Sequence, residues 1–379
     1  MNTRALLTAS AAVLAAAAAA WAQMATADRV QGPGFWPTQA SPARKDFLGP
    51  AACARCHVSH AQSQAGTSMA QTAMKAADAP TLRDHPTLRF RSETHTYEIQ
   101  TRDGTSVFSA TASDGSSSSA PLVWAFGAGK VGQTYLFEKD GVLQEGRLSY
   151  FSGHGGDFTP ARAIKAPKDL AEAMGRPIPD PEARRCFACH NTASTASGVF
   201  DTKGLILGIT CEACHGPGRK HVEALEQKKL GAALDAIMNP AKLDPAASVD
   251  FCGACHATFW DVKLAGEEGI AALRSQPNRL QSSRCWGAGD ARITCVACHD
   301  PHVPLVREAA FYDSRCLSCH VQAAAPPATA RVAPTTDHPG RACPVARESC
   351  VTCHMPKYEA PGMHHDFTDH RIRIVARPR

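Results

Sequence analysis

Hydrophobic and polar residues alternate along one part of the chain, between residues 86 and 159. Alternation with a period of two is typical of strands that bury one face. It occurs in six short runs, at residues 88–91, 94–101, 106–111, 122–126, 134–138 and 142–151. Dipeptides that favour tight turns separate the runs: Asp103-Gly104, Asp114-Gly115 and Asp140-Gly141. The pattern predicts an antiparallel meander of hairpins, with a loop tip at 116–119 and with His95 on the same packed face as Tyr97 and Ile99.

Outside this stretch, apolar residues with helical spacing occur only in short pieces. Residues 219–234 and 262–274 have the pattern of amphipathic helices. Pro and Gly are frequent around them, and residues 326–334 predict a loop or linker. We therefore expect short helices, long loops and little sheet in this part of the chain.

The N-terminus has the layout of a secretory signal peptide. A short basic start is followed by an Ala-rich apolar run to residue 20, and small residues around Ala22 suit cleavage before Gln23. The alternative is an uncleaved anchor, but the run is too short and too rich in Ala for a good spanning helix. No later stretch is long and apolar enough to cross a bilayer. Residues 1–22 therefore predict a protein that is periplasmic or otherwise exported, without a membrane span after cleavage.

Cysteine is the most informative residue type in this chain. Fourteen of the sixteen cysteines form seven Cys-x-x-Cys pairs, and His follows every pair directly. The pairs are Cys53 and Cys56, Cys186 and Cys189, Cys211 and Cys214, Cys252 and Cys255, Cys295 and Cys298, Cys316 and Cys319, and Cys350 and Cys353. The histidines that follow are His57, His190, His215, His256, His299, His320 and His354. C-x-x-C-H is the attachment motif of c-type haem.

The spacing of the motif has a chemical reason. Two thiols three residues apart can add to the two vinyl groups at one edge of a porphyrin, which places the following imidazole under the iron as its proximal ligand. Zinc knuckles, redox-active pairs and disulfides are the alternatives, but none of them requires His directly after the second cysteine. We therefore expect seven covalently bound haem c groups. The two other cysteines, Cys285 and Cys343, could form a disulfide or remain unpaired.

Ten histidines lie outside the motifs, and seven irons each need a sixth ligand or an open position. Mostly bis-His ligation is the natural interpretation. A histidine three residues after a proximal one cannot reach the opposite face of the same haem, so it should bind a neighbouring haem. The candidate distal ligands are His60, His154, His221 and His302, each with the alternative of a surface or propionate-binding role. Met69 and Met355 are more often core side chains than ligands.

Composition and charge agree with a haem protein. Aromatic residues make up only 6% of the chain, and seven porphyrins would supply the missing apolar mass. The formal net charge of the polypeptide is +5. Each haem adds two propionates, about fourteen negative charges in all, so the basic side chains are expected to pair with propionates. The positive charge is therefore not a sign of nucleic-acid binding.

The order of the motifs resembles that of a known family, the periplasmic multihaem cytochromes of the cytochrome c-552/4 type. These are related to the electron acceptor of hydroxylamine oxidoreductase and to the pentahaem nitrite reductases. The resemblance rests on FLGPAACARCH, FGAGKVGQTYLFEKDGVLQEGRLSYF, CFACHNT, GITCEACHGPGRKH, NPAKL, TCVACHDPH, SCVTCHMPK and FTDHRI, in this order.

This resemblance implies stacked and perpendicular haem pairs, with His221 and His302, and also His338 and His370, as distal ligands. Two features depart from the family pattern. We expect no tetratricopeptide repeat domain, which some members carry. After the first motif, relatives often have a histidine at a position where this chain has the stretch that ends at Met69. Met69 is therefore worth testing as a ligand.

These patterns together predict a mostly α-helical and irregular multihaem cytochrome c, with an antiparallel β insert between the first and second haem sites. The expected parts are a signal peptide (1–22), a first haem-binding segment (23–85), a β-rich insert (86–160) and a six-haem cytochrome domain (161–379).

The preferred function is an exported heptahaem carrier that transfers electrons between redox partners in the periplasm, such as other cytochromes or a quinol oxidase. The alternative is a reductase or oxidase of a small nitrogen or sulfur compound at one open-coordinate haem. The C-x-x-C-K motif that marks the catalytic haem of the nitrite reductases is absent from the sequence. A third possibility is an assembly role, in which the β insert docks a partner rather than caps the first haem. We expect no catalytic residue, and the sequence does not indicate an oligomeric state.

Overall fold

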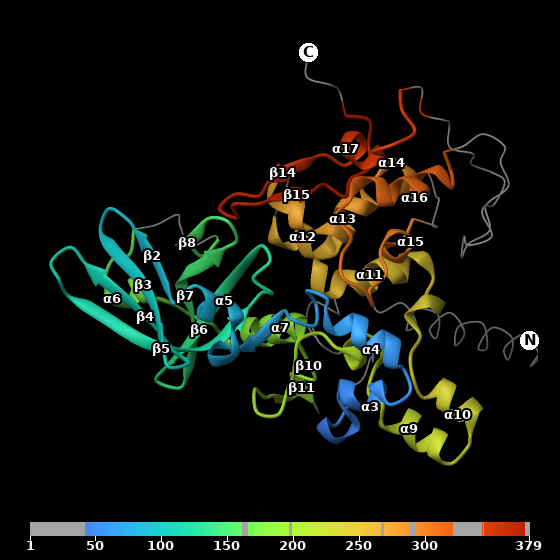
Figure 1. The fold of residues 1–379 in the computed structure, drawn as a ribbon, viewed down its shortest axis with the longest axis horizontal. Coiled ribbons are helices and arrows are strands. Elements are labelled where there is room, and N and C mark those ends of the chain that lie inside the picture. The colour runs from blue at the N-terminus through green and yellow to red at the C-terminus, as the bar shows by residue number, and fades with distance from the viewer. Residues whose placement is uncertain are drawn as a thin grey trace, which may run out of the picture.

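The computed structural model describes residues 42–160, 166–196, 199–266, 269–287, 293–320, 343 and 345–375. Figure 1 shows a large β-sheet on the left and a group of short helices on the right. Among these residues, none of the helices combines the length and the hydrophobicity needed to span a bilayer. The predicted signal peptide, the predicted linker at 326–334 and His338 lie outside the described residues.

The sheet has nine strands. Seven follow one another in chain order, and each pairs with its neighbour in antiparallel fashion: β2 (Thr87–Arg91), β3 (His95–Arg102), β4 (Thr105–Ala112), β5 (Ser117–Phe126), β6 (Gly132–Lys139), β7 (Val142–Phe151) and β8 (Gly155–Phe158). Two short strands join from the side, β1 (Ala73–Lys75) on β5 and β9 (Gly175–Pro177) on β7. The predicted antiparallel meander is confirmed.

Two of the hairpins turn through the predicted Asp-Gly pairs. Positive φ angles of 49° and 76° at Asp103-Gly104, and of 52° and 75° at Asp140-Gly141, suit two-residue turns that match the twist of the strands. The predicted loop tip at 116–119 is wrong, because β5 already begins at Ser117. The Asp114 carboxylate accepts hydrogen bonds from the backbone N–H and the hydroxyl of Ser116, at 2.8 and 2.6 Å, and so closes the turn earlier.

The sheet curls until its first and last strands meet, so that it is nearly a barrel. The Phe90 ring of β2 lies 4.5 Å from the Phe158 ring of β8. A Cβ on Gly156 would lie 3.0 Å from the carbonyl oxygen of Arg89, which explains glycine at this close approach. The enclosed core contains Tyr97, Ile99, Phe108, Leu122, Tyr135, Phe137 and Leu148. His95 is buried on the same face as Tyr97 and Ile99, as predicted.

The helices are short. Those around the sheet and the first two motifs are η1 (Arg44–Asp46), α3 (Pro50–Ala54), α4 (Val58–Ala65), η2 (Ala76–Asp78), α5 (Pro80–Asp84), α6 (Leu170–Met174) and α7 (Asp180–His190). Those that follow are α8 (Cys211–His215), α9 (Arg219–Glu226), α10 (Leu230–Asp235), η3 (Pro240–Lys242), α11 (Pro245–His256), α12 (Phe259–Ala265), η4 (Ala271–Arg274), α13 (Gln276–Gln281), α14 (Arg284–Gly287), α15 (Cys295–Cys298), η5 (Ala309–Tyr312), α16 (Asp313–Leu317) and α17 (Cys350–His354).

Both segments with a predicted helical pattern contain helices, but the helix is interrupted in each. The segment 219–234 forms α9 and α10, because the chain turns at Lys228 with a φ of 58°. In the segment 262–274, α12 ends at Gly266, whose φ of 67° forms a left-handed C-cap. Three two-stranded ladders complete this part: β10 (Asn191–Thr192) with β13 (Ile206–Leu207), β11 (Thr195–Ala196) with β12 (Val199–Phe200), and β14 (Lys357–Glu359) with β15 (Asp366–Thr368).

The sheet packs against the helical part at two places. Trp124 and Phe126 of β5 form an apolar cluster with Phe187 of α7. Phe151, at the end of β7, forms a second cluster with Leu273 and Met363, and Met363 lies in the turn between β14 and β15. The β-rich segment is therefore held on the helical part by side chains rather than only by chain connections.

Candidate haem-binding sites

Each C-x-x-C-H motif lies on or beside one turn of helix. The second, third, fourth and seventh motifs are contained in α7, α8, α11 and α17. In the first and fifth motifs, the histidine N–H donates to the carbonyl of the first cysteine at 2.9 Å, and in the sixth motif at 3.0 Å. Residues three and four apart share a face of a helix, so both thiols and the imidazole of a motif are directed to the same side. This arrangement suits thioether attachment and proximal ligation of one haem.

Several imidazoles are oriented by one type of hydrogen bond. In each, Nδ1 lies 2.8–3.0 Å from a backbone carbonyl oxygen: His190 from Thr72, His215 from Met238, His221 from Ala233, His354 from Arg373 and His370 from Thr368. Because a carbonyl can only accept, Nδ1 must be the protonated nitrogen. The lone pair of Nε2 then remains for a metal, as in other metal-binding histidines whose second nitrogen is hydrogen-bonded.

Two pairs of histidines have the spacing of axial ligands. The rings of His215 and His302 have centroids 6.1 Å apart and are tilted by only 16°. The rings of His299 and His370 have centroids 6.2 Å apart. Two imidazoles that bind one iron from opposite sides, with metal–nitrogen bonds of about 2 Å, place their ring centroids about 6 Å apart. Each pair joins a motif histidine to one from a distant segment, and the donor set therefore fits haem iron.

The protonation of these imidazoles also fits metal binding. Burial lowers the pKa of His190, His215 and His299. Burial and the neighbouring His299 lower the pKa of His370 to about 4. These rings are therefore neutral near pH 7, and the neutral imidazole is the form that coordinates a metal.

Thiols of different motifs interact with one another. The interaction with Cys53 lowers the pKa of Cys211 to about 7, for example. The interacting thiol pairs are Cys53 with Cys211, Cys189 with Cys255, Cys252 with Cys295, and Cys316 with Cys350. Electrostatic interactions also connect Cys214 with Cys252 and Cys298 with Cys316. All seven motifs thus form one connected set, in which the fourth motif interacts with the second, the third and the fifth.

Two carboxylates join neighbouring motifs by capping a helix from another segment. Glu212, between the two cysteines of the third motif, accepts hydrogen bonds from the backbone N–H groups of Leu48 and Gly49 at the start of α3, at 2.9 and 2.8 Å. Asp313, at the start of α16, accepts from the backbone N–H groups of Ser349 and Cys350 at 2.6 and 2.8 Å. A carboxylate at a helix N-terminus satisfies free N–H groups and complements the helix dipole. Neither role could be predicted from the sequence, because the helices that these carboxylates cap are far away in the chain.

The sheet contacts the second motif. Phe187, between the cysteines of this motif, is fully buried and meets the rings of Trp124 and Phe126 edge-on at 5.2 and 5.0 Å. Phe126 also stacks on His190 at 4.8 Å. The sheet thereby fixes the helix that presents the second motif, a contact that the sequence did not predict.

Other residues singled out from the sequence lie in different surroundings. The ring centroids of His60 and His302 are 4.8 Å apart. His154 lies against His364 and Asp157. Cys285 and Cys343 are both unpaired in the structure.

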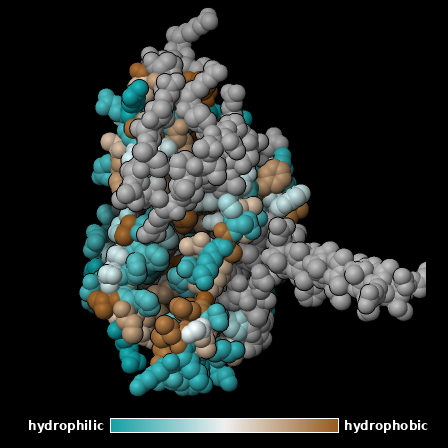
Figure 2. All heavy atoms as spheres, turned by 90° about the vertical axis from the view of Figure 1, so that its right-hand side faces the viewer, coloured by the Kyte–Doolittle hydropathy of each residue, from teal (hydrophilic) through white to brown (hydrophobic). Residues whose placement is uncertain are grey.

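Apolar side chains are exposed on the helical part. In Figure 2 they gather low on the visible face, over the α9–α10 hairpin. Leu225, Leu230 and Leu234 of this hairpin are exposed, as are Val296 inside the fifth motif and Leu305 after His302. Contiguous exposed apolar surface usually marks a binding surface, and its position beside the motifs suits contact with porphyrin.

One comparison with known proteins agrees with this chemistry. Residues 160–216, which contain the second and third motifs, match the family described as cytochrome c554 and c-prime. No curated protein matches the chain. A solved structure titled "Crystal Structure of Outer Cell Wall Cytochrome OcwA" is similar with 18% sequence identity and a TM-score of 0.32, over 56% of this chain and 38% of that one. The family match, together with the motifs that it contains, supports a c-type cytochrome with covalently bound haem that functions in electron transfer.

Proposed function

We propose that this chain is an exported heptahaem cytochrome c that passes electrons between redox partners in the periplasm. The observation that carries the proposal is the presence of seven C-x-x-C-H motifs, two of which lie in the segment that matches the cytochrome c554 and c-prime family. Cysteines of different motifs also lie close enough to influence one another. Haem iron, when bound, supplies one-electron chemistry. The polypeptide holds the attachment points close together and orients the ligands.

The proposed ligand set begins with the seven motif histidines as proximal ligands. His302 would be the distal ligand opposite His215, and His370 the one opposite His299, on the basis of their ring spacing. His302 would thus serve the third motif although it directly follows the fifth, which fits the argument that it must bind a neighbouring haem. His60, His221 and His338 stay predictions as further distal ligands. His154, which was also predicted as one, lies against His364 and Asp157 instead.

The proposed route of the electrons rests on the proximity of the motifs to one another. The first motif leads through the third to the fourth, and the fifth, sixth and seventh continue from there. The second motif branches from the fourth. Cys56 of the first motif and Cys353 of the seventh are exposed, and other cytochromes or a quinol oxidase are the proposed partners. The N-terminal signal pattern supports the periplasmic location.

Electron paramagnetic resonance of the oxidised, fully haem-loaded protein tests the proposal. Intact mass should first confirm seven haems per chain. Low-spin signals that account for all seven irons are expected if every iron has two protein ligands. A large high-spin signal that shifts with nitrite, hydroxylamine or sulfite would instead place the chain among enzymes with an open haem.

Two variants sharpen this test. His302→Ala and His370→Ala should each convert one iron from low spin to high spin. His365→Ala is the matched control for His370→Ala, because His365 lies five residues earlier, in the turn between β14 and β15, and meets the ring of Phe367 edge-on. If either of the first two variants kept seven low-spin irons, the ligand assignment would be wrong while the electron-transfer role could still hold.

A further inference from the structure

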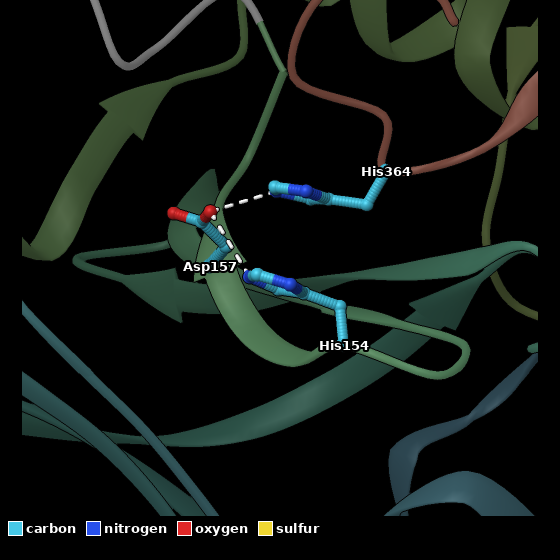
Figure 3. A group of neighbouring side chains, drawn as sticks. All are labelled: His154, Asp157 and His364. Carbon is cyan, nitrogen blue, oxygen red and sulfur yellow. Dashed lines mark hydrogen bonds and ion pairs between the residues drawn. The ribbon is translucent and has the colours of Figure 1, made fainter.

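Three polar side chains meet where the sheet touches the C-terminal hairpin. His154 lies in the turn between β7 and β8, and Asp157 lies in β8. His364 lies in the turn between β14 and β15, 207 positions after Asp157. Figure 3 shows both imidazoles directed toward the same carboxylate.

The geometry of the three groups is compact. The two imidazole rings are stacked, with centroids 3.7 Å apart and an angle of 6° between their planes. Nε2 of His364 lies 2.7 Å from Oδ2 of Asp157, and Nε2 of His154 lies 3.5 Å from the same oxygen. The three ligand atoms are all within 4.8 Å of one another. His364 adopts a φ of 47°, which is unusual for a residue other than glycine, and Phe151 packs edge-on against its ring.

We propose that His154, Asp157 and His364 bind one divalent transition-metal ion, with Zn²⁺ as the expected occupant. Two imidazoles and one carboxylate are a common set of three protein ligands for zinc, which takes a water molecule as the fourth ligand. With metal–ligand bonds of about 2.0–2.2 Å, tetrahedral ligand atoms lie about 3.4 Å apart. The His154–Asp157 distance already has this value. To bind one ion, the hydrogen-bonded His364–Asp157 pair must open slightly, and one imidazole must rotate out of the stack so that the in-plane lone pairs of both rings converge.

A bound metal ion would also remove the repulsion between the two imidazoles and balance the charge of the carboxylate. Two imidazoles at stacking distance repel each other when both are protonated, and one carboxylate compensates only one positive charge. A bound cation accepts the lone pairs of two neutral rings and the charge of the carboxylate at once. The His154 side chain is 45% exposed, so the ion and its water can enter from the solvent.

The site would fasten the C-terminal hairpin to the sheet. His364 lies six residues before His370, the ring that faces His299. The metal would therefore stabilise the segment that carries His370 without itself taking part in electron transfer. This inference is independent of how many haems the chain carries.

Zinc binding by the haem-loaded protein tests this inference. After treatment with a chelator and desalting, ZnCl₂ is titrated by calorimetry, the ratio of zinc to iron is measured, and the zinc X-ray absorption spectrum is recorded. The wild type should bind one Zn²⁺ per chain with two imidazole ligands. Asp157→Ala and His364→Ala should each lower the affinity by at least about tenfold, since even residues that only support metal ligands contribute 10- to 100-fold.

His365→Ala is the matched control and should bind zinc like the wild type. Zinc uptake that is equal in the wild type and in His364→Ala would overturn the proposal. So would a His154→Ala variant that binds zinc normally but loses a low-spin haem signal, because His154 would then be a haem ligand.

Discussion

One buried carboxylate controls the position of the His370 imidazole. Asp369 is 1% exposed and accepts hydrogen bonds from Arg279 at 2.8 and 2.6 Å and from Arg373 at 2.7 Å. Burial by itself raises the pKa of this group, but the hydrogen bonds from the two guanidinium groups and from the N–H of Arg371 lower it to about 2. Asp369 therefore stays ionised near neutral pH, and the next residue, His370, faces His299.

Replacing this carboxylate should destabilise the protein. Asp369→Asn leaves two guanidinium groups without their counter-charge, and breaking a buried ion pair costs about 3–5 kcal/mol. A group whose pKa falls on folding contributes stability above its unfolded pKa and loses it on protonation. The wild type should therefore lose this contribution between about pH 4 and pH 2, and the variant should lack it.

Denaturant unfolding at several pH values, followed by far-ultraviolet circular dichroism, measures both effects. Asp366→Asn in β15 is the control, because this residue is exposed. An equal loss of stability in both variants would refute the role of Asp369.

A second carboxylate acts between motifs. Glu212 is 2% exposed and accepts three backbone hydrogen bonds, two from the start of α3 and one from Gly218 at 2.8 Å. Glu212→Gln removes the charge and weakens these bonds, and hydrogen bonds to charged groups contribute about 1.5–3 kcal/mol each.

The expected result for Glu212→Gln is a lower free energy of unfolding and altered low-spin signals from the first and third haems. Glu223→Gln is the comparison, since Glu223 is exposed and its ion pair with Arg219, at 3.9 Å, should contribute less than about 1 kcal/mol. Similar losses in both variants would mean that Glu212 does not fasten the two motifs.

At the level of elements, a glycine marks the close contact between the first and third motif segments. A Cβ on Gly208, whose φ is 72°, would lie only 1.9 Å from the carbonyl oxygen of Ala70. Gly208→Ala should therefore cost about 1 kcal/mol for the left-handed backbone and about 1–3 kcal/mol more for the steric conflict.

The same chain segment offers a control for Gly208→Ala. Gly204 has a similar φ of 78°, but its Cβ would meet nothing closer than the Arg44 side chain at 3.9 Å. Gly204→Ala should therefore show only the backbone cost, and thermal unfolding of both variants separates the two contributions. Equal melting temperatures would contradict the close contact.

The features that could be predicted from the sequence are those that depend on neighbouring residues. Asp-Gly turns and period-two alternation are local, and a C-x-x-C-H motif needs only one helical turn, so these features follow from neighbouring residues. The partners of His215 and His299 are 87 and 71 positions away, at His302 and His370, and no local pattern encodes such distances. The helical pattern at 219–234 is interrupted because the left-handed residue Lys228 separates α9 from α10, and propensity alone does not reveal it.

At the scale of the whole molecule, the fourth motif is the junction of the proposed route. Cys255 interacts with Cys189 of the second motif, and Cys252 interacts with Cys214 of the third and Cys295 of the fifth. His256 likewise interacts electrostatically with His190 and His299. The seventh motif, in contrast, connects through its thiols only to the sixth among the interactions found in the described part of the chain. Removal of the haem at the fourth motif should therefore slow electron exchange among the remaining haems, whereas removal of the haem at the seventh motif should not.

The expected difference can be measured by removing one haem at a time. The protein is reduced by a pulse that delivers less than one electron per chain. In the variant Cys252→Ala/Cys255→Ala, the electrons should stay divided among separate groups of haems, because electron exchange between these groups is slow. In Cys350→Ala/Cys353→Ala, which removes a terminal haem, the six remaining haems should equilibrate as fast as in the wild type. Intact mass must show six haems in both variants, and time-resolved visible absorption follows the redistribution. Equally fast equilibration in both variants would mean that electrons bypass the fourth motif, and the branched route derived from the thiol contacts would have to be abandoned even if the protein is a carrier.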